Sequence, residues 1–346
     1  MKSKTLNNLN TLRLAAAGLV LYGHSFVFLG LPEPVFLSWL PLGTLGVYIF
    51  FAISGYLVTQ SWQQDPHLLR FFQRRALRIF PALIVCTLLS MLLLGPLLST
   101  LPLDQYFSHA ATWHYLKNIA LYITYYLPGV FEHLRVPNAV NGSLWSLPVE
   151  FFMYIMVALL GMLSGRLWLS VLIFAASAAA SFFWAQATTQ MLVVYATDLR
   201  QVFICGTYFW AGALFYQLDI KRYFSLTTFA VAAVAMLCLE TFPTSMHLAS
   251  WVLLPFVVLA FGLSDNSWVG KLTASGDYSY GFYIYAFPVQ QAIVFLYPGM
   301  ALPSYLLLST ALTFTLAMLS WHGIEQPMLR LKPFNPRNPT YKGALT

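Results

Sequence analysis

Long, unbroken runs of hydrophobic residues dominate the chain, and short polar segments separate them. Each run approaches the ~20 apolar residues that an α-helix needs to cross the hydrocarbon core of a bilayer. An outer-membrane β-barrel would instead show short segments in which polar and apolar residues alternate. The pattern predicts spans near residues 10–30, 42–61, 77–98, 141–163, 167–186, 199–217, 223–240, 248–264, 277–297 and 303–324. We therefore expect an all-α integral membrane protein, a bundle of about ten transmembrane helices.

The composition agrees with lipid as the main solvent. Hydrophobic residues make up 59% of the 346 and charged residues only 8%, whereas a typical soluble domain carries about 25% charged residues. The net charge of +7 would suggest nucleic acid as a partner if it covered a soluble surface. Here the charges lie almost wholly between the apolar runs, so we expect membrane lipid, and no nucleic acid, as a partner.

The distribution of Lys and Arg predicts the topology. Most of the 18 Lys and Arg residues lie in segments on one side of the predicted bundle, and only Lys117, Arg135 and Arg200 lie in segments on the other. Positively charged loops stay in the cytoplasm, so both termini are expected there. We interpret residues 1–346 as one transmembrane domain, with 99–140 as a non-cytoplasmic lid or interfacial segment and 331–346 as a short cytoplasmic tail.

Two ionisable residues, Arg13 and His24, lie within the first span. They are separated by about 20° around a helix and by about 16 Å along it, so they share one face. One interpretation is structural, with an arginine that reaches the interface and a packed histidine. The other is chemical, because ionisable groups inside a membrane often mark functional sites and a neutral imidazole can accept a proton from a hydroxyl.

A basic cluster precedes the third span. Arg75 and Arg78 are three residues apart and fall on one helical face at the cytoplasmic mouth of the bundle. They could simply set the topology, which is the interpretation that we prefer for Arg70 and Arg74. A pair of guanidinium groups at this position could also bind phosphates, whose oxygens match the planar fork of arginine.

Further polar candidates lie in residues 141–155 and 279–291. Glu150 follows a helix entry that contains Ser143, and a lone carboxylate at this depth needs a partner or a proton. It could be structural or could act on a substrate. Trp145 lies at interface depth, where it could anchor the helix. Tyr283 belongs to a Ser- and Tyr-rich helix face that could hydrogen-bond a polar ligand.

The sequence lacks the signatures of several other kinds of site. The 7 His residues are scattered without metal-ligand spacing, and the 3 Cys residues lie inside apolar segments, where they are expected to be small buried side chains. No phosphate-binding Gly-rich loop, dinucleotide motif or Gly-x-Ser-x-Gly elbow is present. We expect no metal site.

Six sequence segments together resemble the bacterial membrane acyltransferase family three, the O-acetylases of surface polysaccharides and related glycans. They are Arg13 with His24 after ten intervening residues, FFAISGYL, RRALRIFPA, NGSLWSLPVEFF, DYSYGFYIYAFPV and WHGIEQP. They occur in the order of the family and cover almost the whole chain. The chain departs from many members at Ala286, where those members have His, and it resembles a stand-alone form without a soluble esterase-like domain.

The resemblance implies a ten-helix bundle in the bacterial cytoplasmic (inner) membrane and a cytoplasmic acyl-CoA donor, most often acetyl-CoA. It implies that Arg13 and His24 form the catalytic motif of the family. It also implies that Arg75 and Arg78 match the cytoplasmic arginine pair of the family, and that Glu150 matches its carboxylate. The expected reaction is O-acylation of a sugar or glycan, possibly lipid-linked.

A mechanism follows from these assignments as a hypothesis. The phosphates of acyl-CoA bind near Arg75 and Arg78, and His24 acts as general base or as an acyl relay. Glu150 orients His24 or the acceptor, while Ser143, Trp145 and Tyr283 contact the acceptor. The alternative function is a secondary transporter or flippase for a glycan or small polar solute, which would also bury Arg, His and Glu. The sequence shows no repeated half to favour it.

Overall fold

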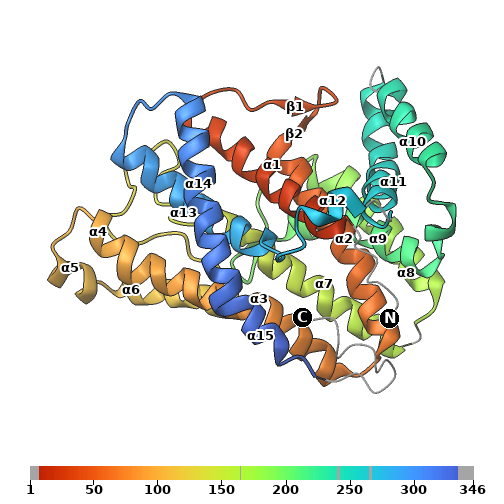
Figure 1. Ribbon diagram of the computed structural model, residues 1–346, viewed down its shortest axis with the longest axis horizontal. Helices are drawn as coiled ribbons and strands as arrows, with labels where there is room; N and C mark the ends of the chain where they lie inside the picture. The colour runs from red at the N-terminus through yellow and green to blue at the C-terminus, as the bar shows by residue number, and fades with distance from the viewer. Residues whose placement is uncertain (1–7, 164, 240–241, 265–266, 334–346) are drawn as a thin grey trace.

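The computed structural model describes residues 8–163, 165–239, 242–264 and 267–333. Lys2, Lys4 and residues 334–346 of the predicted tail lie outside the described residues. All ten predicted spans fall on helices (Figure 1). The helices that match the first five are α1 (Leu9–Leu29), α2 (Leu42–Gln64), α3 (Leu68–Leu89), α7 (Ser146–Leu163) and α8 (Leu167–Ala180). The helices that match the last five are α9 (Leu199–Gln217), α10 (Leu226–Leu239), α11 (Pro243–Gly262), α13 (Ser279–Leu296) and α14 (Leu302–Ser320).

Several of these helices continue through tighter or wider turns. π-Helical turns extend α3, α8 and α14 at η1 (Ser90–Leu94), η4 (Ser181–Ala185) and η6 (Trp321–Glu325). The chain then enters α4 (Gly95–Leu98) after η1 and α15 (Gln326–Arg330) after η6. A 3-10 turn, η3 (Gly142–Trp145), leads into α7. The remaining short pieces are η5 (Ile220–Tyr223), α12 (Ser267–Lys271) and two small antiparallel hairpins, β1–β2 (Val35–Phe36 with Leu40–Pro41) and β3–β4 (Val193–Val194 with Thr197–Asp198).

Membrane character is confirmed by helix length and composition. Among the described residues, six helical segments are long and apolar enough to cross a bilayer: Leu9–Leu29, Leu42–Gln64, Leu68–Leu98, Gly142–Leu163, Leu167–Ala185 and Leu302–Arg330. α10 and α11 contribute the shorter apolar stretches Thr227–Leu239 and Met246–Gly262. α9 and α13 are largely buried by other helices, where protein contacts replace lipid contacts. Ten spans and two cytoplasmic termini remain predictions.

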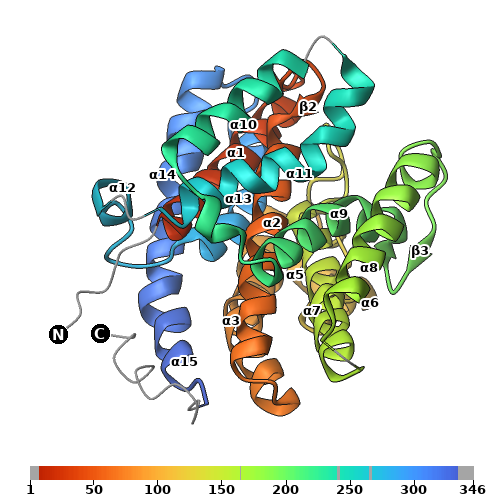
Figure 2. The same ribbon diagram turned by 90° about the vertical axis from the view of Figure 1, so that its right-hand side faces the viewer.

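The centre of the bundle is α2, which packs most extensively on α9 and α1. Small residues permit this close approach. A Cβ atom on Gly55 of α2 would overlap the carbonyl oxygen of Phe209 in α9, and one on Gly212 of α9 would overlap the carbonyl oxygen of Ala52 in α2. Interfaces between membrane helices use such residues to bring backbones together. In the second view of the bundle α8 lies outside α9, at the edge of the molecule (Figure 2).

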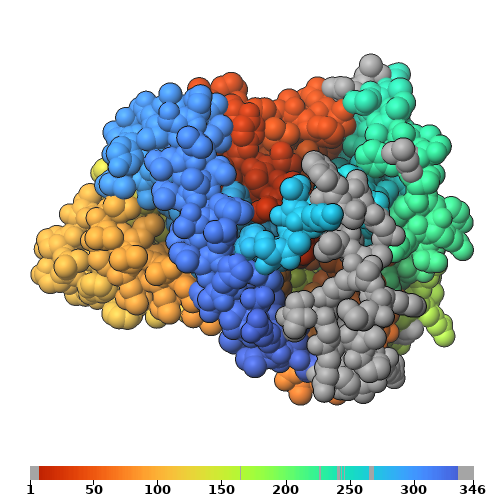
Figure 3. All heavy atoms as spheres, in the orientation of Figure 1, coloured from red at the N-terminus to blue at the C-terminus, as the bar shows by residue number. Residues whose placement is uncertain are grey.

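The segment 99–140 contains no spanning helix. It forms α5 (Leu103–Ser108), α6 (Ala110–His114), η2 (Tyr115–Ala120) and irregular chain, and it projects from the bundle at the left of Figures 1 and 3. A small separate core joins it to η1, and there the hydroxyl of Tyr106 donates to the carbonyl of Met91 at 2.8 Å. Its role as a lid or interfacial segment remains a prediction.

Candidate active site

A cavity of about 390 Å³ lies between α1, α2, α3 and α7, and the start of α13 and the end of α15 complete its wall. Polar residues from the C-terminal end of α2, including Ser61 and Gln64, line one part of it. This part lies on the predicted cytoplasmic side, because the segment that follows α2 carries the basic cluster Arg70, Arg74 and Arg75 at the start of α3. Five of the predicted site residues line the cavity: Arg13, Arg75, Arg78, Glu150 and Tyr283.

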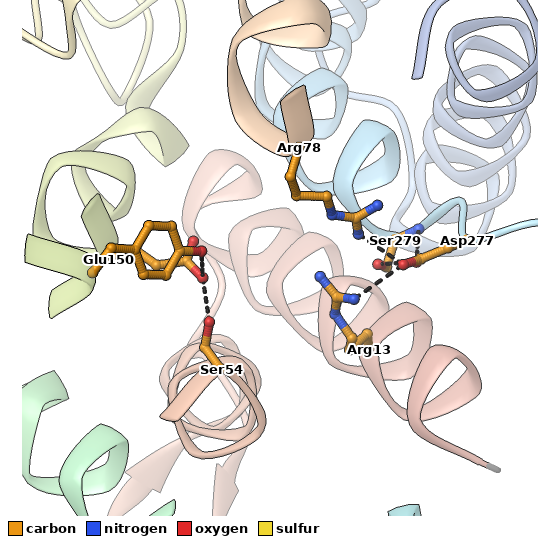
Figure 4. Close-up of polar contacts among 7 residues, drawn as sticks. Arg13, Ser54, Arg78, Glu150, Asp277 and Ser279 are labelled. Atoms are coloured by element: carbon orange, nitrogen blue, oxygen red, sulfur yellow. Dashed lines mark hydrogen bonds and ion pairs between the residues drawn. The ribbon is translucent and has the colours of Figure 1, made fainter. Parts of the chain in front are cut away.

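One carboxylate, Asp277, joins two of these arginines (Figure 4). Arg13 donates from Nη1 to Oδ2 of Asp277 at 3.0 Å, and Arg78 donates from Nη2 to the same oxygen at 2.7 Å. The other oxygen, Oδ1, accepts from the hydroxyl of Ser279 at 2.5 Å and from its backbone N–H at 3.3 Å. Asp277 is thereby fixed at the start of α13 and ties α1 and α3 to it.

Glu150 forms a second polar cluster on the opposite wall (Figure 4). Its Oε1 accepts from the hydroxyl of Ser54 in α2 at 2.5 Å and from the hydroxyl of Tyr154, one turn later in α7, at 2.7 Å. The lone carboxylate noted in the sequence therefore has hydroxyl partners from two helices. These partners fix the carboxylate at the cavity surface.

The other arginines at the start of α3 have different partners. The guanidinium of Arg75 lies over the rings of Phe71 and Tyr154, at 5.9 and 5.7 Å from their centroids. Its Nη2 donates to Ser61 at the long distance of 3.4 Å, and its Nε has no partner among the described residues. Arg75 therefore keeps donors for a ligand.

Arg74, predicted only to set the topology, is instead buried and also lines the cavity. It donates to Oδ2 of Asp65 at 2.7 Å, and Arg70 donates to both oxygens of the same carboxylate. The hydrogen bonds from Arg70, reinforced by Arg74, hold the pKa of the Asp65 carboxyl well below its usual value although burial opposes this. Asp65, in the loop before α3, therefore pairs with both of these arginines at the start of α3.

The three predicted acceptor-binding residues do not lie together at the cavity. Tyr283 lines it, and its hydroxyl donates to the carbonyl of Ser143 at 3.0 Å and lies 2.7 Å from the hydroxyl of Ser146. Ser143 is buried behind this contact, and its own hydroxyl has no partner among the described residues. Trp145 packs against the apolar core.

His24 lies beyond the cavity. It follows Arg13 by about 16 Å along α1 and does not line the cavity. Its ring packs against Phe28 and Phe287, at centroid distances of 5.9 and 5.3 Å. Phe287 is one turn after Tyr283 in α13, so its ring lies near the inner end of the cavity. The Nδ1 atom of His24 is buried without a partner in the described part of the chain.

Sequence reasoning gave no role to Asp277 or to Lys332, which also lines the cavity. A signal for Asp277 was present, because two arginines inside a bundle need an anion and few carboxylates are available. Lys332 gave no signal, since it is one of many cations on the predicted cytoplasmic side. Among the described residues, no group of three or more His, Cys, Asp or Glu could hold a metal ion.

Comparison with known proteins identifies the family. The profile of the acyltransferase family 3, described as an acyltransferase domain, matches residues 6–322. The chain is 30% identical to an O-acetyl transferase of Shigella phage Sf6 over 330 residues, which cover 93% of this chain and 96% of the relative. It is 35% identical to nodulation protein 10 of Rhizobium leguminosarum bv. viciae over 167 residues, 44% of each chain.

No solved structure matches the chain. The two sequence findings agree with the motifs noted above, and the family match spans nearly the whole chain. The arginines of α1 and α3, Glu150 of α7 and the start of α13 belong to those motifs and meet at one cavity. The chain belongs to the acyltransferase family 3 of membrane acyltransferases.

Proposed function

We propose that the protein moves an acyl group, most simply acetyl, from a cytoplasmic acyl-CoA to a hydroxyl of a sugar or glycan, in the bacterial cytoplasmic membrane. The observation that carries this proposal is the convergence of Arg13, Arg75 and Arg78 on one cavity at the predicted cytoplasmic side. Such a cationic site favours a ligand with several phosphates. The similarity to an O-acetyl transferase of a phage supports acetyl transfer to oxygen.

The donor is expected to bind with its phosphates near Arg75 and Arg78. Its pantetheine arm then extends along α1 and α13, past Tyr283, toward His24. The cavity volume of about 390 Å³ lies in the range of small-molecule pockets. Because His24 packs against Phe287, which lies one turn of α13 beyond Tyr283, the thioester reaches His24 only when the ring of Phe287 moves aside. That displacement is part of the proposal.

In the transfer step, an acceptor hydroxyl attacks the thioester carbonyl carbon. A C–O bond forms, the C–S bond breaks, and the thiolate of CoA leaves. His24 takes the hydroxyl proton as general base and returns it to the thiolate. In the relay variant, the imidazole first accepts the acyl group and then yields it to the acceptor. Arg13 lies at the cavity end of the pantetheine arm, where it stabilises negative charge on the donor. Glu150 orients the acceptor or His24.

The acceptor class is a sugar or glycan, possibly linked to a lipid. An aromatic ring and several hydroxyls are available along its expected route, in Trp145, Ser143 and Tyr283. In this proposal Tyr283 takes the most direct part, and its position in the cavity wall supports that role. Ser143 acts through the hydroxyl of Tyr283, to which it offers its carbonyl oxygen.

Donor kinetics test this proposal. The purified protein in proteoliposomes should release CoA from acetyl-CoA, and the double variant Arg75→Ala with Arg78→Ala should chiefly raise the KM for acetyl-CoA. Arg222→Ala serves as the control, because this arginine does not line the cavity and lies over the ring of Tyr223. If the wild-type protein releases no CoA, the proposed reaction is wrong. If it does, but the double variant keeps the wild-type KM, the assignment of phosphate binding is wrong.

A further inference from the structure

The charged groups that line the cavity do not balance. Five are cations and three are carboxylates: Arg13, Arg74, Arg75, Arg78 and Lys332 against Asp65, Glu150 and Asp277. Asp277 pairs with Arg13 and Arg78, and Asp65 pairs with Arg74. Glu150 is bonded to hydroxyls. In the described chain, Arg75 and Lys332 are therefore the lining cations without a carboxylate partner.

We propose that Lys332 and Arg75 form an anion-binding subsite at the cytoplasmic mouth of the cavity, which binds a phosphate of the acyl donor. The subsite rests on the proposed function for the identity of its ligand. It adds Lys332 to the donor-binding residues, and it assigns Arg78 mainly to the ion pair with Asp277.

The surroundings of Lys332 favour an anion. Lys332 follows the end of α15 and is half-buried. Burial, together with the positive charges of Arg78 and Arg75, lowers the pKa of Lys332 to about 7. Since like charges held close together repel each other, a phosphate placed between them would relieve this repulsion. The negative charge of Asp277 acts in the opposite direction and raises the pKa of Lys332. Asp277 is already paired with Arg13 and Arg78.

Arg75 is prepared for a ligand in a different way. Its guanidinium is held over Tyr154 and Phe71, which fixes its position without using its N–H donors. Within the described residues, its side chain makes one hydrogen bond, the long one of 3.4 Å to Ser61. A guanidinium with free donors binds phosphate oxygens in pairs, and Lys332 supplies a second positive charge in the same cavity wall.

The position of the subsite agrees with the direction of the donor. Arg75 contacts Ser61 near the C-terminal end of α2, at the predicted cytoplasmic side, whereas His24 lies about 16 Å beyond Arg13 along α1. A donor whose phosphates bind at the mouth therefore extends its thioester arm inward. This order places the charged end in contact with cytoplasm and the reactive end inside the bundle.

Truncated donors test the subsite. The variants Lys332→Ala and Lys332→Arg are compared on acetyl-CoA and on S-acetyl-pantetheine, which lacks every phosphate. We expect Lys332→Ala to raise the KM for acetyl-CoA about tenfold, since hydrogen bonds to charged groups contribute about that much. We expect no change in kcat and none in the KM for S-acetyl-pantetheine. Lys332→Arg should keep the wild-type KM.

Lys271→Ala is the matched control, because this lysine is exposed on the predicted cytoplasmic side and does not line the cavity. An equal rise in KM for both donors, or no rise for either, would overturn the subsite. Binding of 3′,5′-ADP, the nucleotide end of CoA, is measured on the same variants. If acetyl-CoA is not a substrate but Lys332→Ala weakens 3′,5′-ADP binding, the subsite stands and the proposed donor fails. Equal or absent binding of 3′,5′-ADP overturns the subsite itself.

Discussion

Arg13 and Arg78 donate to the same oxygen atom, Oδ2 of Asp277, at 3.0 and 2.7 Å. The two arginines come from helices α1 and α3, and the carboxylate precedes α13. A buried charge is costly in a membrane protein unless it is paired. Asp277 meets that need for two arginines at once. It thereby fixes the relative positions of the helix that carries His24 and the helix that carries Arg75.

Replacing Asp277 should lower both stability and turnover. Asp277→Asn keeps the shape but leaves two partly buried guanidinium groups without an anion. Loss of one partner of a buried pair costs on the order of 3–5 kcal/mol, so Tm should fall by several degrees. The catalytic effect should appear mainly in kcat, because Arg13 loses its fixed position.

Asp277→Glu should restore part of kcat, because it restores the charge. Asp198→Asn is the control, because Asp198 pairs with Arg200 and does not line the cavity. It should lower Tm without changing kcat. Thermal unfolding and steady-state kinetics on the three variants decide the matter. A wild-type kcat in Asp277→Asn would contradict the positioning role.

The hydroxyls of Ser54 and Tyr154 should matter for catalysis through Glu150. Each donates to Oε1 of Glu150, and a hydrogen bond to a charged group is worth about 1.5–3 kcal/mol when it is shielded from water. We therefore expect Ser54→Ala and Tyr154→Phe each to lower kcat by about tenfold, the lower end of that range. The KM for the donor should not change.

Ser250→Ala provides the comparison, since Ser250 is a buried serine that lies 3.1 Å from the hydroxyl of Tyr208, away from the cavity. All variants are measured for turnover and for thermal stability. If Ser54→Ala lowers Tm as much as Ser250→Ala but leaves kcat unchanged, Glu150 is structural.

Donor affinity should depend on pH through Lys332. Its pKa of about 7 means that it is charged below pH 7 and increasingly neutral above. The charges that face it are Arg78, Arg75 and Arg13, and Asp277. A bound phosphate stabilises the protonated amine, so binding takes up a proton and weakens as pH rises. The Kd for CoA should therefore increase between pH 6.5 and pH 8.5.

Lys332→Arg removes this dependence, because a guanidinium stays charged over the whole interval. The interval starts at pH 6.5 because a phosphate monoester itself gains charge near pH 6. Titration calorimetry in two buffers of different ionisation enthalpy also counts the protons taken up. A Kd that is equally flat in the wild-type protein and in Lys332→Arg would contradict the role of this amine.

The contact between α2 and α9 should not tolerate a larger residue. A side chain at Gly55 would overlap the backbone carbonyl of Phe209, which cannot turn away as a side chain would. Gly55→Val should therefore give a protein of much lower Tm or one that fails to accumulate in the membrane. Gly18→Ala is the matched control, since no atom lies within 4 Å of a Cβ atom placed there. Equal thermal stability of the two variants would contradict the close packing.

The helices were predictable because lipid imposes a simple rule on them. Runs of apolar residues near the bilayer thickness must be helical, since their backbone groups have no water to bond, and all ten predicted spans fall on helices. The structure of 99–140 could not be predicted in the same way. Its core around Tyr106 and Phe131 depends on side-chain contacts over many residues, for which the sequence shows no period.

The candidate site was predictable in part. Arg13, Arg75, Arg78 and Glu150 stood out because charges are costly in a membrane, and they meet at one cavity. The sequence could not show which charges pair. Arg74 resembles its neighbours in sequence but is buried against Asp65.

His24 illustrates a different limit. Helical geometry places it on the same face as Arg13, but the distance along α1 takes it out of the cavity that Arg13 lines. Only the structure shows the ring of Phe287 against it. Whether a histidine at this position reacts depends on packing between α1 and α13, which no local pattern encodes.

The most direct measurement follows radiolabel from [acetyl-¹⁴C]CoA in proteoliposomes that contain wild-type protein, His24→Ala or His247→Ala. His247 is the matched control, because it too lies on a helix among aromatic rings but does not line the cavity. We predict that the wild-type protein and His247→Ala release the label from CoA, and that His24→Ala inserts normally and releases none. Undiminished release by His24→Ala would contradict both the general-base and the relay mechanism, and would place the chemistry on other residues of the cavity.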